Sequence, residues 1–120
     1  MKIFLVEDSR VVRERLRGMA TCIPGIALAG ETDNEEDAIR EIIATLPDVV
    51  ILDLYLADGS GLGVLRRIRL QPFAIKMIVL TNHSNPCYRD TCVNLGADYF
   101  LDKTHEISQL ESLLNQLVRH

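Results

Sequence analysis

Cysteine is scarce in this sequence, and the spacings in which it usually binds metal are missing. The 120 residues contain 3 cysteines, Cys22, Cys87 and Cys92, without CxxC spacing and without the histidines clustered beside them. An odd and scattered set argues against a disulfide framework and against a zinc site. We therefore expect reduced thiols that serve mainly in packing, in a cytoplasmic protein.

Long apolar runs and a basic face are also missing. The longest apolar runs have the length of a strand, so the sequence predicts no membrane-spanning segment. One lysine and a short apolar run precede Glu7-Asp8, which is not the pattern of a signal peptide. With Lys+Arg 13 against Asp+Glu 17 and a net charge of −4, we expect neither direct nucleic-acid binding by this domain nor a membrane partner.

Repeats, linkers and low-complexity segments are absent as well, and the length predicts one domain over residues 1–120. The sequence instead alternates regularly between two patterns. Short apolar runs, typical of strands buried on both faces, alternate with amphipathic helical stripes. The predicted strands are residues 2–6, 26–30, 49–52, 76–80 and 99–101.

Five strands that are each followed by a helix predict an α/β fold. The expected architecture is an open, doubly wound, five-stranded parallel sheet with helices on both faces and right-handed crossovers. Ser9 and Ser60 are expected to cap the first and third helices, and Thr32-Asp33-Asn34-Glu35 has the pattern of a capping box for the second. Arg13 is expected on a solvated face of the first helix.

Polar residues follow four of the five predicted strands. Glu7 and Asp8 come after the first strand, Asp53 after the third, Thr81 after the fourth and Lys103 after the fifth. In an open parallel sheet these ends lie at one edge, where ligands bind. The sequence therefore predicts one site that contains three carboxylates, a hydroxyl and an ammonium.

Clustered carboxylates favour a particular chemistry. A pair ~4 Å apart in an effective dielectric of about 20 repels by roughly 4 kcal/mol, and a hard divalent cation such as Mg²⁺ relieves this repulsion. A carboxylate such as Asp53 can attack phosphorus and form an acyl phosphate without a general base. In another interpretation Lys103 pairs with Asp53 as a buried ion pair, which can also be the resting state of a working site.

In this order and spacing, the residues resemble the receiver domain of two-component response regulators, including single-receiver chemotaxis regulators, over essentially the whole chain. The segments 59–62 (Gly-Ser-Gly-Leu) and 96–100 (Gly-Ala-Asp-Tyr-Phe) are similar to family segments too. The resemblance implies the flavodoxin-like (βα)5 fold with strand order 2-1-3-4-5.

The resemblance also implies a role in phosphorelay signal transduction. Asp53 would accept a phosphoryl group from a sensor histidine kinase or phosphotransfer protein, with Mg²⁺ as cofactor. The metal ligands would be Glu7, Asp8, Asp53 and the backbone carbonyl of Tyr55. Apart from phosphorylation and dephosphorylation of Asp53 itself, the resemblance implies no enzymatic activity.

The same resemblance assigns the remaining site residues. Thr81 and Lys103 would bind the phosphoryl oxygens, and Thr81 and Phe100 would move as switch residues. The face made by the fourth helix, the fifth strand and the fifth helix would then bind a downstream effector or a second receiver, as in a homodimer.

The chain departs from the family pattern at four positions. Thr104 follows Lys103 where the family usually has a proline with a cis peptide bond, and Ala57 stands where a proline is common. Phe100 lacks a hydroxyl, so any signal through it depends on packing. Glu7 replaces the commoner aspartate, which is a familiar variation.

The same residues bear on three other possible functions. Loss of a site residue would favour a receiver fold that docks a partner without phosphorylation, but none of Asp8, Asp53, Thr81 and Lys103 is lost. A small hydrolase with Asp53 as nucleophile generally has a D-x-D pattern, but Tyr55 occupies the third position. A flavodoxin-like cofactor binder needs a phosphate-cradling loop where Glu7-Asp8 would repel phosphate. Residues 58–62 are similar to receivers joined to helix-turn-helix outputs, so the output stays open.

Overall fold

The computed structural model describes residues 1–82, 86–102 and 107–119. Within these residues, strands and helices alternate as the sequence predicts. The strands are β1 (Lys2–Val6), β2 (Ala27–Thr32), β3 (Val49–Leu52), β4 (Lys76–Thr81) and β5 (Tyr99–Asp102). The helices are α1 (Arg10–Thr21), α2 (Glu35–Thr45), α3 (Gly61–Arg69), α4 (Pro86–Asn94) and α5 (Ile107–Arg119).

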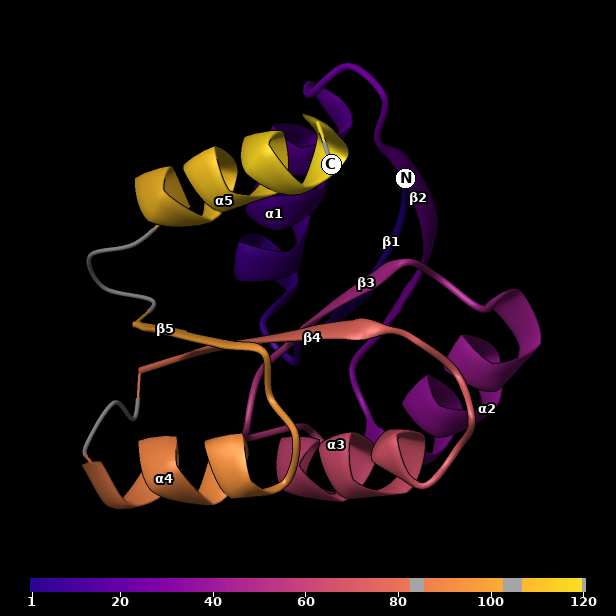
Figure 1. Ribbon diagram of the computed structural model, residues 1–120, viewed down its shortest axis with the longest axis vertical. Helices are drawn as coiled ribbons and strands as arrows, with labels where there is room; N and C mark the ends of the chain where they lie inside the picture. The colour runs from indigo at the N-terminus through magenta and orange to yellow at the C-terminus, as the bar shows by residue number, and fades with distance from the viewer. Residues whose placement is uncertain (83–85, 103–106, 120) are drawn as a thin grey trace.

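The strands form one parallel sheet in the order β2-β1-β3-β4-β5. This confirms the doubly wound, flavodoxin-like fold and the predicted order 2-1-3-4-5. Figure 1 shows α1 and α5 on one side of the sheet and α2, α3 and α4 on the other. The strand order reverses between β1 and β3, which is where a ligand is expected in a sheet of this kind.

The central strands supply two cores, because successive side chains of a strand point to opposite faces. Ile3 and Leu5 of β1 pack with residues of α1 and α5, whereas Phe4 and Val6 pack with residues of α2, α3 and α4. Both faces are covered, so these strands are apolar throughout instead of alternating with polar residues. The edge strand β2 is largely half-buried, in keeping with its weaker apolar pattern.

The start of α2 differs from the predicted capping box. Thr32 pairs with Val6 at the end of β2 and is buried, so the sheet holds it and it does not cap the helix. Asn34 is the cap instead. Its Oδ1 accepts a hydrogen bond from the Asp37 N–H at 2.9 Å, and its Nδ2 donates to the Asp37 carboxylate at 2.9 Å. The prediction was wrong because β2 continues two residues beyond its predicted end.

The structure also bears on the cysteines and on membrane-spanning segments. Cys92, a residue of α4, is buried, but Cys22 and Cys87 are exposed, so the expected packing role applies to one thiol of the three. In the part of the chain that the structure describes, no helix combines the length and the apolar character needed to cross a bilayer.

Candidate functional site

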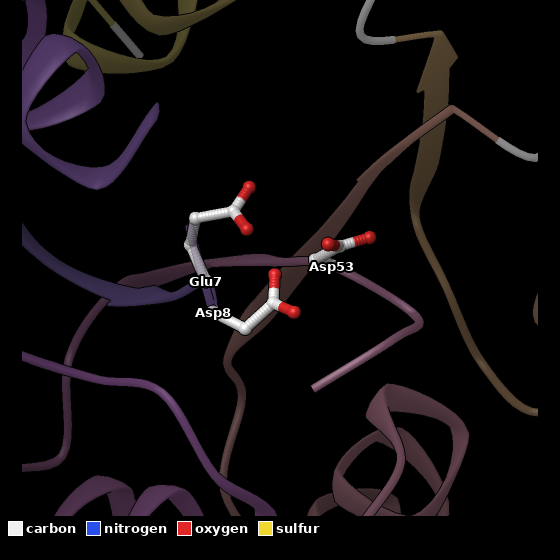
Figure 2. A group of neighbouring side chains, drawn as sticks. All are labelled: Glu7, Asp8 and Asp53. Carbon is white, nitrogen blue, oxygen red and sulfur yellow. The ribbon is translucent and has the colours of Figure 1, made fainter. Parts of the chain in front are cut away.

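The carboxyl ends of three neighbouring strands bring most of the predicted site residues together. Glu7 and Asp8 directly follow β1, Asp53 follows β3, and Thr81 is the last residue of β4. Since β1 pairs with β3 and β3 pairs with β4, these residues meet at one edge of the sheet. Figure 2 shows Glu7, Asp8 and Asp53 gathered there. One carboxylate oxygen from each of the three residues lies within 4.8 Å of the others.

Burial distinguishes Asp8 from the other three residues. Glu7 is 1% exposed, Asp53 6% and Thr81 0%, whereas Asp8 is exposed to solvent. Burial of an ionised carboxylate is unfavourable unless polar partners or a cation compensate its charge. The site therefore combines two buried carboxylates with one that solvent can reach.

Hydrogen bonds hold Glu7 at three points. Its backbone N–H donates to the Thr32 carbonyl at 3.0 Å, and its own carbonyl accepts from Arg13 Nη1 at 2.9 Å. Its Oε2 accepts from the Ser9 N–H at 3.0 Å. The backbone of Asp53 is also anchored, because its N–H donates to the last carbonyl of β1 at 2.9 Å. These bonds fix the positions from which the carboxylates project.

The loop after Asp53 rests on the connection between β2 and α2. The Glu35 N–H donates to the Asp58 carbonyl at 2.9 Å. The Glu35 carboxylate accepts from the Ser60 N–H at 2.8 Å, at the start of α3, where the helix dipole favours a negative charge. The second strand-helix unit thus braces a loop of the third.

Gly61 closes this loop against Asp53. Its N–H donates to the Leu54 carbonyl at 2.9 Å. A Cβ atom at this position would lie 2.0 Å from the carbonyl oxygen of Asp53, which is backbone and has little room to move. The close approach of α3 to Asp53 therefore requires glycine.

Tyr55, two residues after Asp53, connects the same loop to α4. Its hydroxyl lies 2.7 Å from the hydroxyl of Tyr88, and the two rings meet edge to face with centroids 6.4 Å apart. The hydrogen bond with Tyr88, followed by desolvation, raises the pKa of Tyr55 above its ordinary value. The loop after Asp53 is therefore in direct contact with α4 through this pair of tyrosines.

Phe100, the predicted switch aromatic, is half-buried against the core beneath α2, α3 and α4. The guanidinium carbon of Arg89 lies 5.4 Å from the centre of its ring, a cation–π distance. Because Tyr88 and Arg89 are adjacent in α4, one turn of this helix contacts both the loop after Asp53 and the predicted switch residue.

Lys103 and Thr104 lie outside the described residues, and so does the peptide bond between them. The roles of Lys103 in binding a phosphoryl group and in pairing with Asp53 remain predictions. The roles assigned to Thr81, Phe100 and the Tyr55 carbonyl also remain predictions, although the structure places these three residues.

The acidic group has the donor chemistry of a site for a hard divalent cation. All three donors are carboxylate oxygens, the ligands that Mg²⁺ prefers, and they come within 4.8 Å of one another. A cation would offset the mutual repulsion of these charges. The exposed position of Asp8 suits an ion that usually retains several of its waters.

Sequence reasoning missed a layer of residues around the site. Arg13 was expected on a solvated helix face, but its side chain is 19% exposed and contacts both Glu7 and Glu31. Its position one helical turn after Ser9, the cap of α1, was a usable signal, because α1 begins only a few residues after β1 ends. Tyr88 carried no such signal, since its partner belongs to a distant segment of the chain.

Comparisons with known proteins agree with this architecture. The family model described as the response regulator receiver domain matches residues 3–115. The transcriptional regulatory protein YvfU of Bacillus subtilis is 29% identical over 119 residues, which cover 99% of this chain and 60% of that protein. The chain thus spans less than two thirds of the length of this and other curated relatives.

Solved structures show the same fold. A DNA-binding response regulator of the LuxR family from Staphylococcus aureus has a TM-score of 0.89 and 28% identity, with 98% of each chain covered. The receiver domain of the sensor histidine kinase PA1611 from Pseudomonas aeruginosa has a TM-score of 0.85 and covers 99% of this chain and 98% of that one. That crystal structure has a magnesium ion coordinated in its active-site cleft; at 23% identity, the likeness shows the fold alone.

Proposed function

This chain belongs to the response regulator receiver domain family, and we propose that Asp53 is the residue through which it acts as a phosphoacceptor in two-component signalling. One observation carries the proposal, which is the convergence of Glu7, Asp8 and Asp53 to within 4.8 Å where β1 and β3 end. The buried hydroxyl residue Thr81 at the end of the next strand supports it.

The transfer would form a bond between a carboxylate oxygen of Asp53 and phosphorus. It would break the bond between phosphorus and a ring nitrogen of the donor histidine, and that nitrogen would leave with the electron pair. The ionised carboxylate is itself the nucleophile, so no side chain has to remove a proton. The Thr81 hydroxyl would donate a hydrogen bond to a phosphoryl oxygen, and the Lys103 ammonium would compensate phosphoryl charge.

Mg²⁺ is the cofactor that we propose for this site. Glu7, Asp8 and Asp53 would hold it together with the backbone carbonyl of Tyr55. When bound, the ion supplies positive charge against the oxygens of the transferring phosphoryl group. The all-carboxylate donor set supports this assignment, and the magnesium ion in the cleft of the PA1611 receiver domain is consistent with it.

Phosphorylation would then be transmitted to the surface formed by α4, β5 and α5. Thr81 would move toward the phosphoryl group and Phe100 inward behind it, as a shift between two populated states. The contacts of Tyr88 and Arg89 support α4 as the responding element, because they link it to the loop after Asp53 and to Phe100.

The partners we propose are a sensor histidine kinase or phosphotransfer protein upstream, and an effector or a second copy of this domain downstream. Residues 1–120 would act as one receiver domain whose chemistry is limited to gain and loss of the phosphoryl group on Asp53. The description of YvfU as a transcriptional regulatory protein supports gene regulation as the output of the whole protein.

Site mapping tests this proposal. The chain is incubated with acetyl phosphate and Mg²⁺, the acyl phosphate is reduced with borohydride, and the modified aspartate is located by peptide mass spectrometry. We expect modification at Asp53. Asp53→Asn should abolish it, whereas Asp58→Asn, a change at an exposed aspartate of the same loop, should retain it. Modification at another residue would contradict Asp53 as the phosphoacceptor. No modification of a folded chain that binds Mg²⁺ would favour a docking module that works without phosphorylation.

A further inference from the structure

We propose that Arg13 is a positioning residue for the metal site, acting through the backbone of Glu7 and not on the metal itself. The inference rests on the function proposed above. Arg13 lies on α1, and its Nη1 donates to the Glu7 carbonyl at 2.9 Å. This carbonyl belongs to the peptide unit that joins Glu7 to Asp8. The guanidinium therefore fixes the peptide plane between two residues of the acidic group.

A second contact fixes the guanidinium. Arg13 Nε lies 3.5 Å from Oε1 of Glu31, and the same oxygen accepts from Arg17 Nη1 at 2.8 Å. The other oxygen, Glu31 Oε2, is buried and has no hydrogen-bond partner among the described residues. Leaving one oxygen of a carboxylate without a partner is costly, so the position of Glu31 depends on the two arginines that compensate its charge.

Glu31 and Thr32 are adjacent in β2, and together they hold both sides of Glu7. The Thr32 carbonyl accepts from the Glu7 N–H at 3.0 Å, while Glu31 holds the arginine that bonds the Glu7 carbonyl. The edge strand β2 supplies none of the three carboxylates of the acidic group, yet it determines where the turn after β1 lies.

Solvent exposure separates the two arginines. The Arg13 side chain is 19% exposed and that of Arg17 is 42% exposed. Water and salt screen a shielded contact less than an exposed one. Arg13 contacts both Glu31 and the Glu7 carbonyl, so it links the positions of these two residues. The Arg17 guanidinium contacts Glu31 and neutralises its charge.

The charge of Arg13 and its positioning effect act on a bound cation in opposite directions. The positive charge of a guanidinium bonded to the Glu7 carbonyl opposes Mg²⁺ binding, but correct placement of Glu7-Asp8 favours it. Arg13→Lys separates the effects, because lysine keeps the charge and loses the planar fork that contacts Glu7 and Glu31 together. Arg17→Lys is the matched control, since it makes the same chemical change on the same helix at a residue that also bonds Glu31.

The experiment measures Mg²⁺ binding by isothermal titration calorimetry, with circular dichroism to verify the fold of each variant. We expect Arg13→Lys to weaken binding about tenfold, the lower end of the range for groups that orient metal ligands, and Arg17→Lys to leave it unchanged. Glu31→Gln, which removes the anchor of Arg13 at nearly constant size, should weaken binding in the same direction. At saturating Mg²⁺, phosphorylation of Arg13→Lys by acetyl phosphate should return to the parent rate.

Two results would overturn the inference. In one, Arg13→Lys and Glu31→Gln both bind Mg²⁺ as tightly as the parent. In the other, Arg13→Lys and Arg17→Lys lose affinity equally, which would assign the effect to the charge around Glu31 and not to the position of Glu7. Failure of the parent chain to bind Mg²⁺ is a separate outcome that would overturn the proposed metal site together with this inference.

Discussion

Gly61 lies so close to Asp53 that the two backbones are in contact. A Cβ atom at position 61 would come within 2.0 Å of the Asp53 carbonyl oxygen and 2.8 Å of the Leu54 Cα. Neither atom belongs to a side chain that could rotate away. The conformation of the proposed phosphoacceptor thus depends on a residue that offers no functional group of its own.

Gly61→Ala is therefore expected to lower the free energy of unfolding by about 1–3 kcal/mol, the usual range for overpacking. It should also slow phosphorylation, because α3 and the backbone of Asp53 have to move apart. Urea denaturation measures the first effect. Gly18→Ala is the control, since nothing lies within 4 Å of the Cβ it would add to α1. It should gain roughly 0.5–1 kcal/mol from helix propensity. Equal stability of Gly61→Ala and the parent would contradict the packing argument.

At the scale of an element, the start of α2 depends on a reciprocal pair of side chains. Asn34 accepts from the Asp37 N–H and donates to the Asp37 carboxylate. The second of these bonds favours the ionised form, and the hydrogen bond with Asn34 is the largest cause that lowers the pKa of Asp37 from its ordinary value of 3.8. The Asn34 cap of α2 and the protonation of the Asp37 carboxylate are therefore coupled.

Asn34→Ala should cost about 1 kcal/mol of unfolding free energy at neutral pH through loss of the cap. The pKa of Asp37 is lower in the folded state, so the ionised Asp37 carboxylate stabilises the fold. This stabilisation is present above pH 3.8 and is lost as the pH falls through the folded-state pKa. The stability difference between parent and variant should narrow as the pH falls below 3.8. Urea denaturation over a pH series measures it, and a difference that is constant with pH would contradict the coupling.

The elements differ in how far the sequence could predict them. The run Val49–Leu52 and the caps Ser9 and Ser60 carry local signals, and all three are confirmed. The predicted cap of α2 was wrong because β2 pairs with β1 as far as Thr32, and this pairing is a tertiary effect that a local pattern does not reveal.

The residues of the site also differ in how far the sequence could predict them. The acidic group could be predicted, since Glu7, Asp8 and Asp53 each follow a recognisable strand and parallel strands end at one edge. The contact between Tyr55 and Tyr88 could not, because it joins segments 33 residues apart and no local sequence pattern pairs these two tyrosines.

At the scale of the whole molecule, two cores on opposite faces of one sheet make the fold a single packed unit. Cys92 belongs to the core beneath α2, α3 and α4 and is 0% exposed. Burial raises the pKa of its thiol to about 11, since a thiolate is unfavourable in apolar surroundings. Cys22 and Cys87 are exposed, so the chain contains two accessible thiols and one that reports on unfolding.

Iodoacetamide at pH 8 should therefore add two groups quickly and a third only slowly, as intact mass spectrometry would show over time. The third addition should become faster with urea, because Cys92 reacts after the core opens. The raised pKa also means that stability falls as the pH rises from the ordinary thiol value of 9.0 toward about 11, since the unfolded chain releases the proton first. Three additions at the same rate in native buffer would contradict burial of Cys92.

The measurement that tests the central claim most directly is the intact mass of the chain after incubation with acetyl phosphate, in Mg²⁺ and in EDTA. Asp53→Asn is treated in parallel. The account predicts one phosphoryl adduct on the parent in Mg²⁺, and none in EDTA or on Asp53→Asn. An equal adduct in EDTA would contradict the role of the acidic group as a metal site, and an adduct on Asp53→Asn would contradict Asp53 as the phosphoacceptor.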